Sequence, residues 1–228
     1  MDMDLLDPRK LVAEVVGTFA LIFFGAGSII MTSGDLVAVA LAHGLAIALS
    51  VSALMGVSHA LFNPALTIGL WATRRLETIT AAGYIIAQLA GAVVAALALV
   101  VLFPEVRRDA ADLGTPLLGE GIDAAQGVGI EAILTFFLML AVFGTAVDSR
   151  GPRVGGFAIG LVITMDILAA GPLTGAAMNP ARSFGPALVD GSWDDWWVYW
   201  VGPVIGAVLA ALLYHYVFAE EESAPMAA

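Results

Sequence analysis

The tripeptide Asn-Pro-Ala occurs twice, at residues 63–65 and 179–181, and each copy opens a short apolar segment. The two segments end near residues 73 and 189, so each is about ten residues long. A ten-residue α-helix is about 15 Å long, half of the ~30 Å hydrocarbon core of a bilayer. We therefore predict two half-helices, residues 63–73 and 179–189, that enter a membrane and stop near its middle.

The residue order of the motif suits the start of a helix. Asparagine is a good N-cap because its side-chain oxygen accepts from the first-turn N–H groups, and proline fits the next position because no N–H is needed there. With that oxygen engaged, the NH₂ groups of Asn63 and Asn179 are expected to remain free donors. If the two helix starts meet tip to tip, these donors and two positive dipole ends face one point at the bilayer centre. Such a point binds an acceptor weakly and repels a cation.

The composition of the chain indicates a membrane protein. It is 60% hydrophobic and only 13% charged, with a mean hydropathy of +0.94, whereas soluble domains carry about 25% charged residues. We predict an all-α integral membrane protein with six transmembrane helices, since each span needs about 20 apolar residues. The expected spans are residues 11–31, 36–57, 79–103, 127–147, 154–170 and 196–218. Residues 58–62 and 171–178 are expected to link the second and fifth spans to the half-helices.

The same composition excludes several classes of function. There is no cysteine, so disulfides and cysteine-based metal or haem sites are absent. The net charge of −11 makes nucleic acid an implausible partner, because phosphate binding needs a basic surface. A hydrolase would need a nucleophile and base or clustered metal ligands, which three scattered histidines do not supply. We expect no enzyme activity, no cofactor and no metal site. Acidic residues at the chain ends are expected to be solvated, namely Asp2, Asp4, Glu220, Glu221 and Glu222.

Two glutamates inside the apolar spans mark an internal repeat. Glu14 precedes Asn63 by 49 residues, and Glu131 precedes Asn179 by 48. Around them, AEVVGTFALIFFGAGS echoes IEAILTFFLMLAVFGT. Each copy holds three spans, so the second is inserted inverted relative to the first, an arrangement found in transport proteins. The chain, residues 1–228, is thus expected to be one domain with a first repeat at about 9–103, a loop at 104–126 and a second repeat at about 127–218.

A carboxylate inside a span is a functional hypothesis by default. The non-helical segments before the two motifs contain backbone N–H groups that must be satisfied internally. Glu14 and Glu131 can accept from them, and we favour this bracing role over a proton relay.

The basic residues predict the orientation in the membrane. Arg107 and Arg108 lie at one end of the predicted bundle. Six others lie at the opposite end: Arg9, Lys10, Arg74, Arg75, Arg150 and Arg153. The positive-inside rule then places both termini in the cytoplasm, in agreement with an even number of spans.

The doubled Asn-Pro-Ala, the paired glutamates and the string MNPARSFGPALV resemble the aquaporin (major intrinsic protein) family over about residues 9–218. The stretches ILAAGPLTGAAMNPARSFGPA and YWVGPVIG are similar to its plant tonoplast intrinsic branch. The resemblance implies the aquaporin fold, a homotetramer in a lipid bilayer with one pore per subunit, no enzyme activity and no cofactor. Its expected partners are water and small neutral solutes.

The resemblance also implies a constriction made by four residues: His43, Ile163, Ala176 and Arg182. Arg182 directly follows the second motif, where a fixed charge excludes cations and its donors orient a passing oxygen. Strict water channels usually carry Phe in place of His43. The pair of His43 and Ile163 implies a wider and differently polar opening, as in the tonoplast branch, which passes water and often ammonia or urea.

Other residues bear on solute and gating. Four of them match the water-conducting pattern of the family: Ser183, Ala187, Tyr199 and Trp200. His59 replaces a small residue near the cytoplasmic mouth and is a candidate pH gate. Asp166 stands where the tonoplast branch has a neutral amide, and is expected either to cap the linker or to face the outer vestibule.

These observations predict a passive water channel that excludes protons and ions. A glycerol or urea facilitator is the first alternative. A secondary transporter, which would also show inverted repeats, is a more remote one, because it should carry a central carboxylate or cation site.

Overall fold

The computed structural model describes residues 6–219, so Asp2, Asp4 and the glutamates 220–222 lie outside the described residues. Within this part of the chain, six helices are long and apolar enough to cross a membrane. They are α1 (Pro8–Thr32), α2 (Leu36–Leu54), α4 (Thr78–Leu102), α6 (Ala124–Val142), α7 (Gly155–Thr174) and α9 (Val198–Leu213). Two of them continue into a π-helical turn: α6 into η3 (Phe143–Val147) and α9 into η4 (Tyr214–Phe218).

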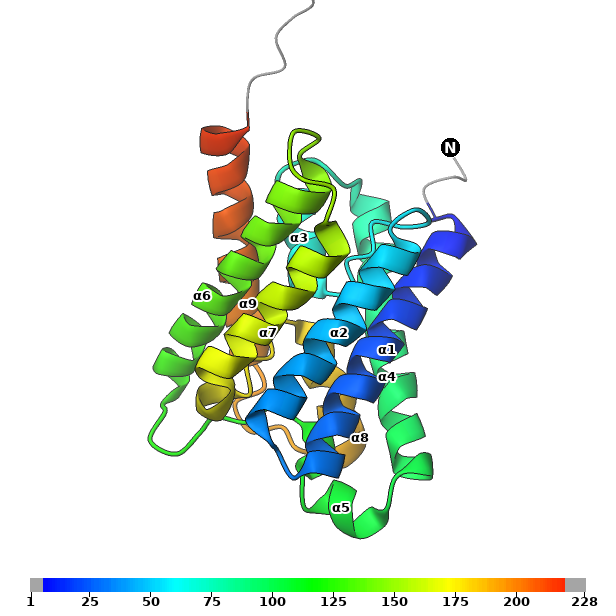
Figure 1. The fold of residues 1–228 in the computed structure, drawn as a ribbon, viewed down its shortest axis with the longest axis vertical. Helices are drawn as coiled ribbons and strands as arrows, with labels where there is room; N and C mark the ends of the chain where they lie inside the picture. Colours follow the sequence, from blue (N-terminus) through cyan, green and yellow to red (C-terminus); the bar gives the residue numbers. More distant parts are fainter. Residues whose placement is uncertain (1–5, 220–228) are drawn as a thin grey trace, which may run out of the picture.

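The two half-helices are α3 (Pro64–Ala72) and α8 (Pro180–Asp190), of 9 and 11 residues. Each begins with proline after an asparagine N-cap in an extended conformation. Each packs on the last long helix of the other repeat, α3 on α9 and α8 on α4, and the two half-helices contact each other. The chain therefore has the predicted all-α fold of six spans and two re-entrant half-helices (Figure 1).

Close helix crossings hold the bundle together. At the α2–α7 crossing, a Cβ added to Gly160 would lie 2.3 Å from the carbonyl oxygen of Gly44. At the α6–α9 crossing, one added to Gly206 would lie 2.0 Å from the carbonyl oxygen of Ala132. Small residues let the backbones approach, which is how membrane helices gain packing without a hydrophobic driving force.

The start of α1 and the end of η4 lie at the same end of the bundle, and α5 (Glu105–Asp109) lies at the opposite end (Figure 1). The connections after α3, residues 73–77, and after η3, residues 148–154, lie at the same end as the start of α1 and the end of η4. The side chain of Arg75 indeed lies 5.3 Å from the ring centroid of Phe143 in η3.

The predicted linker 171–178 is wrong, because α7 extends four residues further, to Thr174. Pro172 sits inside the last turn, and Gly175 ends the helix in the left-handed region with φ +77°, its N–H bonded to the carbonyl of Gly171 at 2.8 Å. Glycine adopts that conformation without a steric cost, so it is the natural stop. The linker is therefore only Gly175–Met178.

The long connection 104–126 is not merely a polar loop. It contains α5 and a short 3₁₀ turn, η2 (Asp112–Gly114), in which Leu113 and Gly114 are buried. A Cβ at Gly114 would lie 2.8 Å from that of Ala26, so η2 packs directly on α1.

Candidate pore through the bundle

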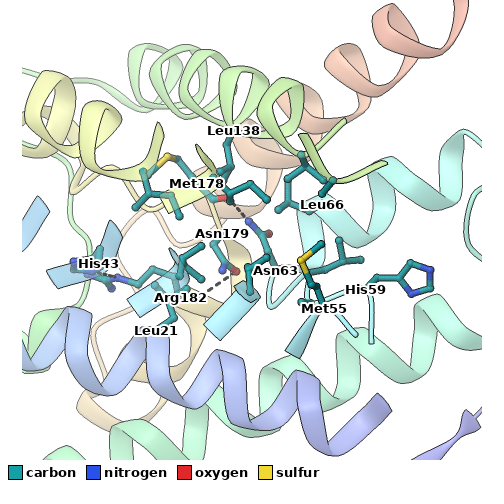
Figure 2. A pocket seen from close by; sticks show the side chains of 18 of the residues that line it. Leu21, His43, Met55, His59, Asn63, Leu66, Leu138, Met178, Asn179 and Arg182 are labelled. Carbon is teal, nitrogen blue, oxygen red and sulfur yellow. Dashed lines mark hydrogen bonds between the residues drawn. The ribbon is translucent and has the colours of Figure 1, made fainter. Parts of the chain in front are cut away.

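A cavity of about 280 Å³ lies between the helices. It is lined by Asn63 and Asn179 of the two motifs and by residues on either side of them. Figure 2 shows His43 and Arg182 at one end, Asn63 and Asn179 in the middle, and Met55 and His59 at the other end. The cavity wall combines apolar side chains from the long helices with the two linkers that precede the motifs.

The two asparagines meet at the centre of this cavity. Oδ1 of Asn63 accepts from Ala65 N at 2.9 Å, and Oδ1 of Asn179 accepts from Ala181 N at the same distance. The expectation that both NH₂ groups remain free is wrong in part. Nδ2 of Asn63 donates to the carbonyl of Met178 at 2.8 Å, and Nδ2 of Asn179 donates to that of Phe62 at 2.9 Å. An amide nitrogen carries two hydrogens, so one N–H of each asparagine is left for the cavity.

Glu14 is fully buried and braces the first linker. Its Oε1 accepts from the Ser58 hydroxyl at 2.8 Å and from Leu61 N at 3.2 Å. Its Oε2 accepts from Phe62 N and from Gln88 Nε2, both at 2.8 Å. Ala60 N donates to the Ser58 hydroxyl at 2.9 Å, so the N–H groups of residues 60, 61 and 62 in this non-helical stretch are all satisfied internally.

Glu131 does the same for the second linker and is also fully buried. Its Oε1 accepts from the Thr174 hydroxyl at 2.7 Å and from Ala177 N at 2.9 Å, and its Oε2 accepts from Met178 N at 2.7 Å. The two sets of contacts correspond residue by residue, except that Glu131 has no counterpart of Gln88 among its hydrogen-bond partners in the described residues.

Both linkers contain non-glycine residues in the left-handed region. They are Ala60 (φ 48°) and Phe62 (φ 51°) in the first linker, and Ala176 (φ 44°) and Met178 (φ 52°) in the second. Such residues cost about 1–3 kcal/mol each and persist only where the surroundings hold them. Here the two carboxylates hold the N–H groups on one side, and the opposite side of each linker lines the cavity.

His43 and Arg182 are in direct contact. Nδ1 of His43 lies 2.8 Å from the carbonyl oxygen of Val39, so this nitrogen carries the proton. Nε2 is then free to accept, and Nε of Arg182 donates to it at 3.1 Å. Both side chains are buried, with exposed fractions of 4% and 2%. The contact turns Arg182 toward α2, where His43 lies. Nη1 of Arg182 is buried and has no hydrogen-bond partner among the described residues, so the guanidinium keeps an unused donor.

Ile163 and Ala176 line the same cavity as His43 and Arg182, and of these four residues His43 and Arg182 are joined by a hydrogen bond. They come from α2, α7, the second linker and α8. In the shortened linker, Ala176 directly follows Gly175, the residue that ends α7.

His59 lines the other end of the cavity. Its Nδ1 lies 3.2 Å from the hydroxyl of Tyr84, a side chain that is only 1% exposed. Burial, and then the positive charge of Lys10, lower the pKa of His59 below its ordinary value of 6.5. The ring is therefore neutral at pH 7.

Ser183, Ala187, Tyr199 and Trp200 do not line this cavity. All four line a separate small hollow, together with Trp193 and Trp196. These four residues therefore gather in a hollow separate from the cavity that the two motifs line.

Asp166 agrees with neither expected position. It lies in α7, is 2% exposed, and is absent from both the linker contacts and the cavity wall. Its Oδ2 has no hydrogen-bond partner among the described residues.

Sequence reasoning missed the apolar part of the wall. It includes Leu21, Ile47, Val51, Met55, Leu66, Leu138, Val142 and Ile159. Within residues 6–219, no group of three or more His, Cys, Asp or Glu side chains is placed to hold a metal ion.

Comparison with known proteins agrees with this geometry. A sequence profile of the Major intrinsic protein family matches residues 4–214. Aquaporin TIP4-4 of Zea mays is 48% identical over 225 residues, covering 92% of this chain and 86% of that one. Aquaporin AqpM of Methanothermobacter thermautotrophicus is 38% identical over 241 residues, covering 93% and 98%. The X-ray structure of the aquaglyceroporin from Plasmodium falciparum matches with a TM-score of 0.83 at 26% identity, covering 92% and 96%.

The fold, the paired motifs and these matches over nearly the whole length lead to one conclusion. The chain belongs to the major intrinsic protein (aquaporin) family, whose members are membrane channels and not enzymes.

Proposed function

We propose that this chain is a passive channel that conducts water, and ammonia or urea, across a membrane and excludes protons and ions. The observation that carries the proposal is the single cavity in which both asparagine caps and Arg182 present donors. The names of the relatives in Zea mays and Methanothermobacter thermautotrophicus, both aquaporins, support water as the main solute.

The mechanism follows from the donors at the centre. A water oxygen that accepts from Asn63 and Asn179 must turn both its hydrogens away from them, so the waters on either side point in opposite directions. The start of each half-helix adds about half a positive charge, and Arg182 adds a full one. Protons and cations are therefore disfavoured, while a neutral acceptor passes.

Selectivity is assigned to His43, Ile163, Ala176 and Arg182. A histidine and an isoleucine leave more room than a phenylalanine and a histidine, and His43 occupies one donor of Arg182. A wider opening with a fixed cation suits water and small neutral solutes that can accept hydrogen bonds. This is the basis for including ammonia and urea.

Of the alternatives, a glycerol or urea facilitator differs only in the size of this constriction. A secondary transporter would need an open central carboxylate, whereas Glu14 and Glu131 are each occupied by linker donors. The hydrogen bonds of both glutamates also favour bracing over proton relay.

We further propose that the chain is one channel domain built as two inverted repeats, that both termini face the cytoplasm, and that it forms a homotetramer. The gathering of six basic residues at the end of the bundle where α1 begins and η4 ends supports this orientation. Light scattering of the purified protein tests the tetramer, and protease access from outside intact cells tests the orientation.

The test of function is stopped-flow light scattering of proteoliposomes under an osmotic shock, and under urea and ammonia gradients. The expected result is fast water flux with a low activation energy, linear in the gradient. Saturable flux coupled to an ion gradient would instead identify a transporter, and water flux equal to that of empty liposomes would reject an open channel.

A further inference from the structure

Gly25 of α1 lies directly behind the ring of His43. A Cβ built on Gly25 would lie 2.5 Å from both Cδ2 and Nε2 of that ring, and 2.9 Å from Cε1. Real Cβ atoms essentially never approach another atom within 3.0 Å. The imidazole of His43 therefore occupies the space that any side chain at position 25 would need.

The orientation of α1 explains why this glycine faces the pore. Leu21 lies one turn before Gly25 on the same helix face and lines the cavity itself. Gly25 is buried on that face, and the ring of His43 covers it.

Two hydrogen bonds of His43 restrict how its ring could move away from α1. Nδ1 is tied to the carbonyl of Val39 at 2.8 Å, and Nε2 to Nε of Arg182 at 3.1 Å. A ring pushed off α1 must move toward Arg182 and the cavity, or lose one of these bonds.

We propose that Gly25 is a positioning residue for selectivity: its missing side chain seats His43 against α1 and so keeps the imidazole ring out of the passage that His43 and Arg182 line together. This inference rests on the proposed role of the four-residue constriction. It adds a fifth position, on a helix that contributes no residue to that set.

The size of the effect follows from the distances. To restore 3.0 Å the ring would have to shift by 0.5 Å, and to restore the ordinary 3.4 Å by 0.9 Å. Hydrogen-bonded waters are about 2.8 Å apart, so this shift is a large fraction of a single-file opening. The narrowing should reduce the flux of a larger solute, such as urea, more than the flux of water.

The test compares wild type with Gly25→Ala, His43→Ala and the double variant, in proteoliposomes matched for protein content. If the narrowing adds about 1.4 kcal/mol to the barrier for urea, Gly25→Ala lowers urea flux about tenfold. Water flux should fall less, so the water-to-urea ratio rises. In the His43→Ala background the same glycine change should alter neither flux, because the clashing ring is gone.

Gly83→Ala in α4 is the matched control. A Cβ at Gly83 would lie 2.5 Å from Cδ2 of Leu6, the same separation as at Gly25, but away from the cavity. This variant should keep both fluxes and the same helical content as wild type.

The outcomes separate the two proposals. If His43→Ala leaves the water-to-urea ratio unchanged, the constriction itself is wrongly assigned. If His43→Ala changes the ratio but Gly25→Ala does not, or if Gly25→Ala acts equally with and without His43, the role of Gly25 is wrong. Should Gly25→Ala not fold, the proposal requires that the double variant fold and match His43→Ala, and failure of both overturns it.

Discussion

The hydroxyl of Tyr214 donates a 2.9 Å hydrogen bond to Oδ2 of Asp148, which ties the π-helical end of α9 to the first residue after the π-helical end of α6. The ring of Tyr214 also packs on Phe143, with centroids 5.2 Å apart. Asp148 in turn pairs with Arg150, which donates to the carbonyl of Phe218 at 2.8 Å. These contacts clamp the loop 148–153 beside Val147, a residue of the cavity wall.

Replacing Tyr214 by phenylalanine should loosen this loop without closing the pore. The ring contact with Phe143 is kept and only the hydrogen bond to Asp148 is lost. Trypsin should then cleave after Arg150 or Arg153 several times faster, because local opening exposes the loop, while water flux stays as in wild type. Tyr216→Phe is the control, since Tyr216 is 76% exposed and should give the wild-type cleavage rate. Equal cleavage of all three proteins would show that the bond does not hold the loop.

Glu14→Gln and Glu131→Gln should both destabilise the channel and reduce water flux. The new NH₂ group faces backbone N–H donors, and each charge-assisted hydrogen bond lost is worth about 1.5–3 kcal/mol. The midpoint of thermal unfolding, followed by circular dichroism in detergent, should fall for both variants. Glu77→Gln, at an exposed position before α4, is the control and should leave the midpoint unchanged. A midpoint unaffected by either buried change would argue against bracing.

Arg182→Lys should keep cation exclusion but relax solute selectivity. Lysine retains a positive charge but cannot offer the planar donor set of arginine, so the Nε–H contact to His43 is lost. One hydrogen bond of about 1 kcal/mol corresponds to a roughly fivefold change in rate, so urea flux should rise by that order while water flux changes less. Proton flux, measured with a dye trapped in the liposomes, should stay at the wild-type level. If urea and water fluxes both match wild type, the contact with His43 does not govern selectivity.

Water flux should depend on His59 only in acid. Because the pKa of His59 is lowered from 6.5 by burial and by Lys10, the folded channel favours the neutral ring. The stabilisation of the neutral form is complete above pH 6.5 and is lost as the pH falls below it. A protonated ring would add a positive charge near Lys10 to the cavity wall that His59 lines. We therefore expect constant flux between pH 7 and 8, a decrease in acid, and no decrease in His59→Gln.

Asp148 and His215 are also titratable and belong to other segments of the chain, so the pH experiment needs a control for each of them. The pKa of Asp148 lies below its usual range, first because of its hydrogen bonds with Arg150, so it stays ionised throughout the assay and the clamp is not titrated. His215→Gln changes a histidine of η4 outside the cavity wall and should keep the wild-type pH profile. Flux that does not vary between pH 5 and 8 would make His59 a plain wall residue.

The fold and the polar centre could be predicted from the sequence because their signals are local. Asn-Pro-Ala specifies a helix start, and a ten-residue apolar segment cannot span a bilayer. The apolar wall could not be predicted for a physical reason. Ile47 and Val51 of α2 and Met55, the residue that caps it, line the cavity. Leu41, Leu45 and Leu49 recur at the same four-residue spacing on the exposed face, at 47%, 54% and 69% exposure. Both faces of the helix are equally apolar, so hydropathy cannot distinguish the face that lines the pore from the face that contacts lipid.

The backbone conformation of the two linkers could not be predicted from the sequence either. Left-handed φ values normally signal glycine, yet Ala60, Phe62, Ala176 and Met178 adopt them, and only the distant glutamates explain why. Likewise, the hydrogen bonds from Asn63 and Asn179 to opposite linkers join residues more than a hundred positions apart. Such contacts depend on the assembled bundle and leave no pattern in the sequence.

The left-handed linkers have a consequence for how this channel can be altered. The linkers line part of the cavity and are held there through main-chain N–H groups, so the course of that part of the wall is set by torsion angles and survives replacement of the linker side chains. Engineering of solute preference is thus confined to the few positions whose side chains reach the passage. Changing the course of a linker would require moving Glu14 or Glu131, the buried carboxylate on another helix that holds it.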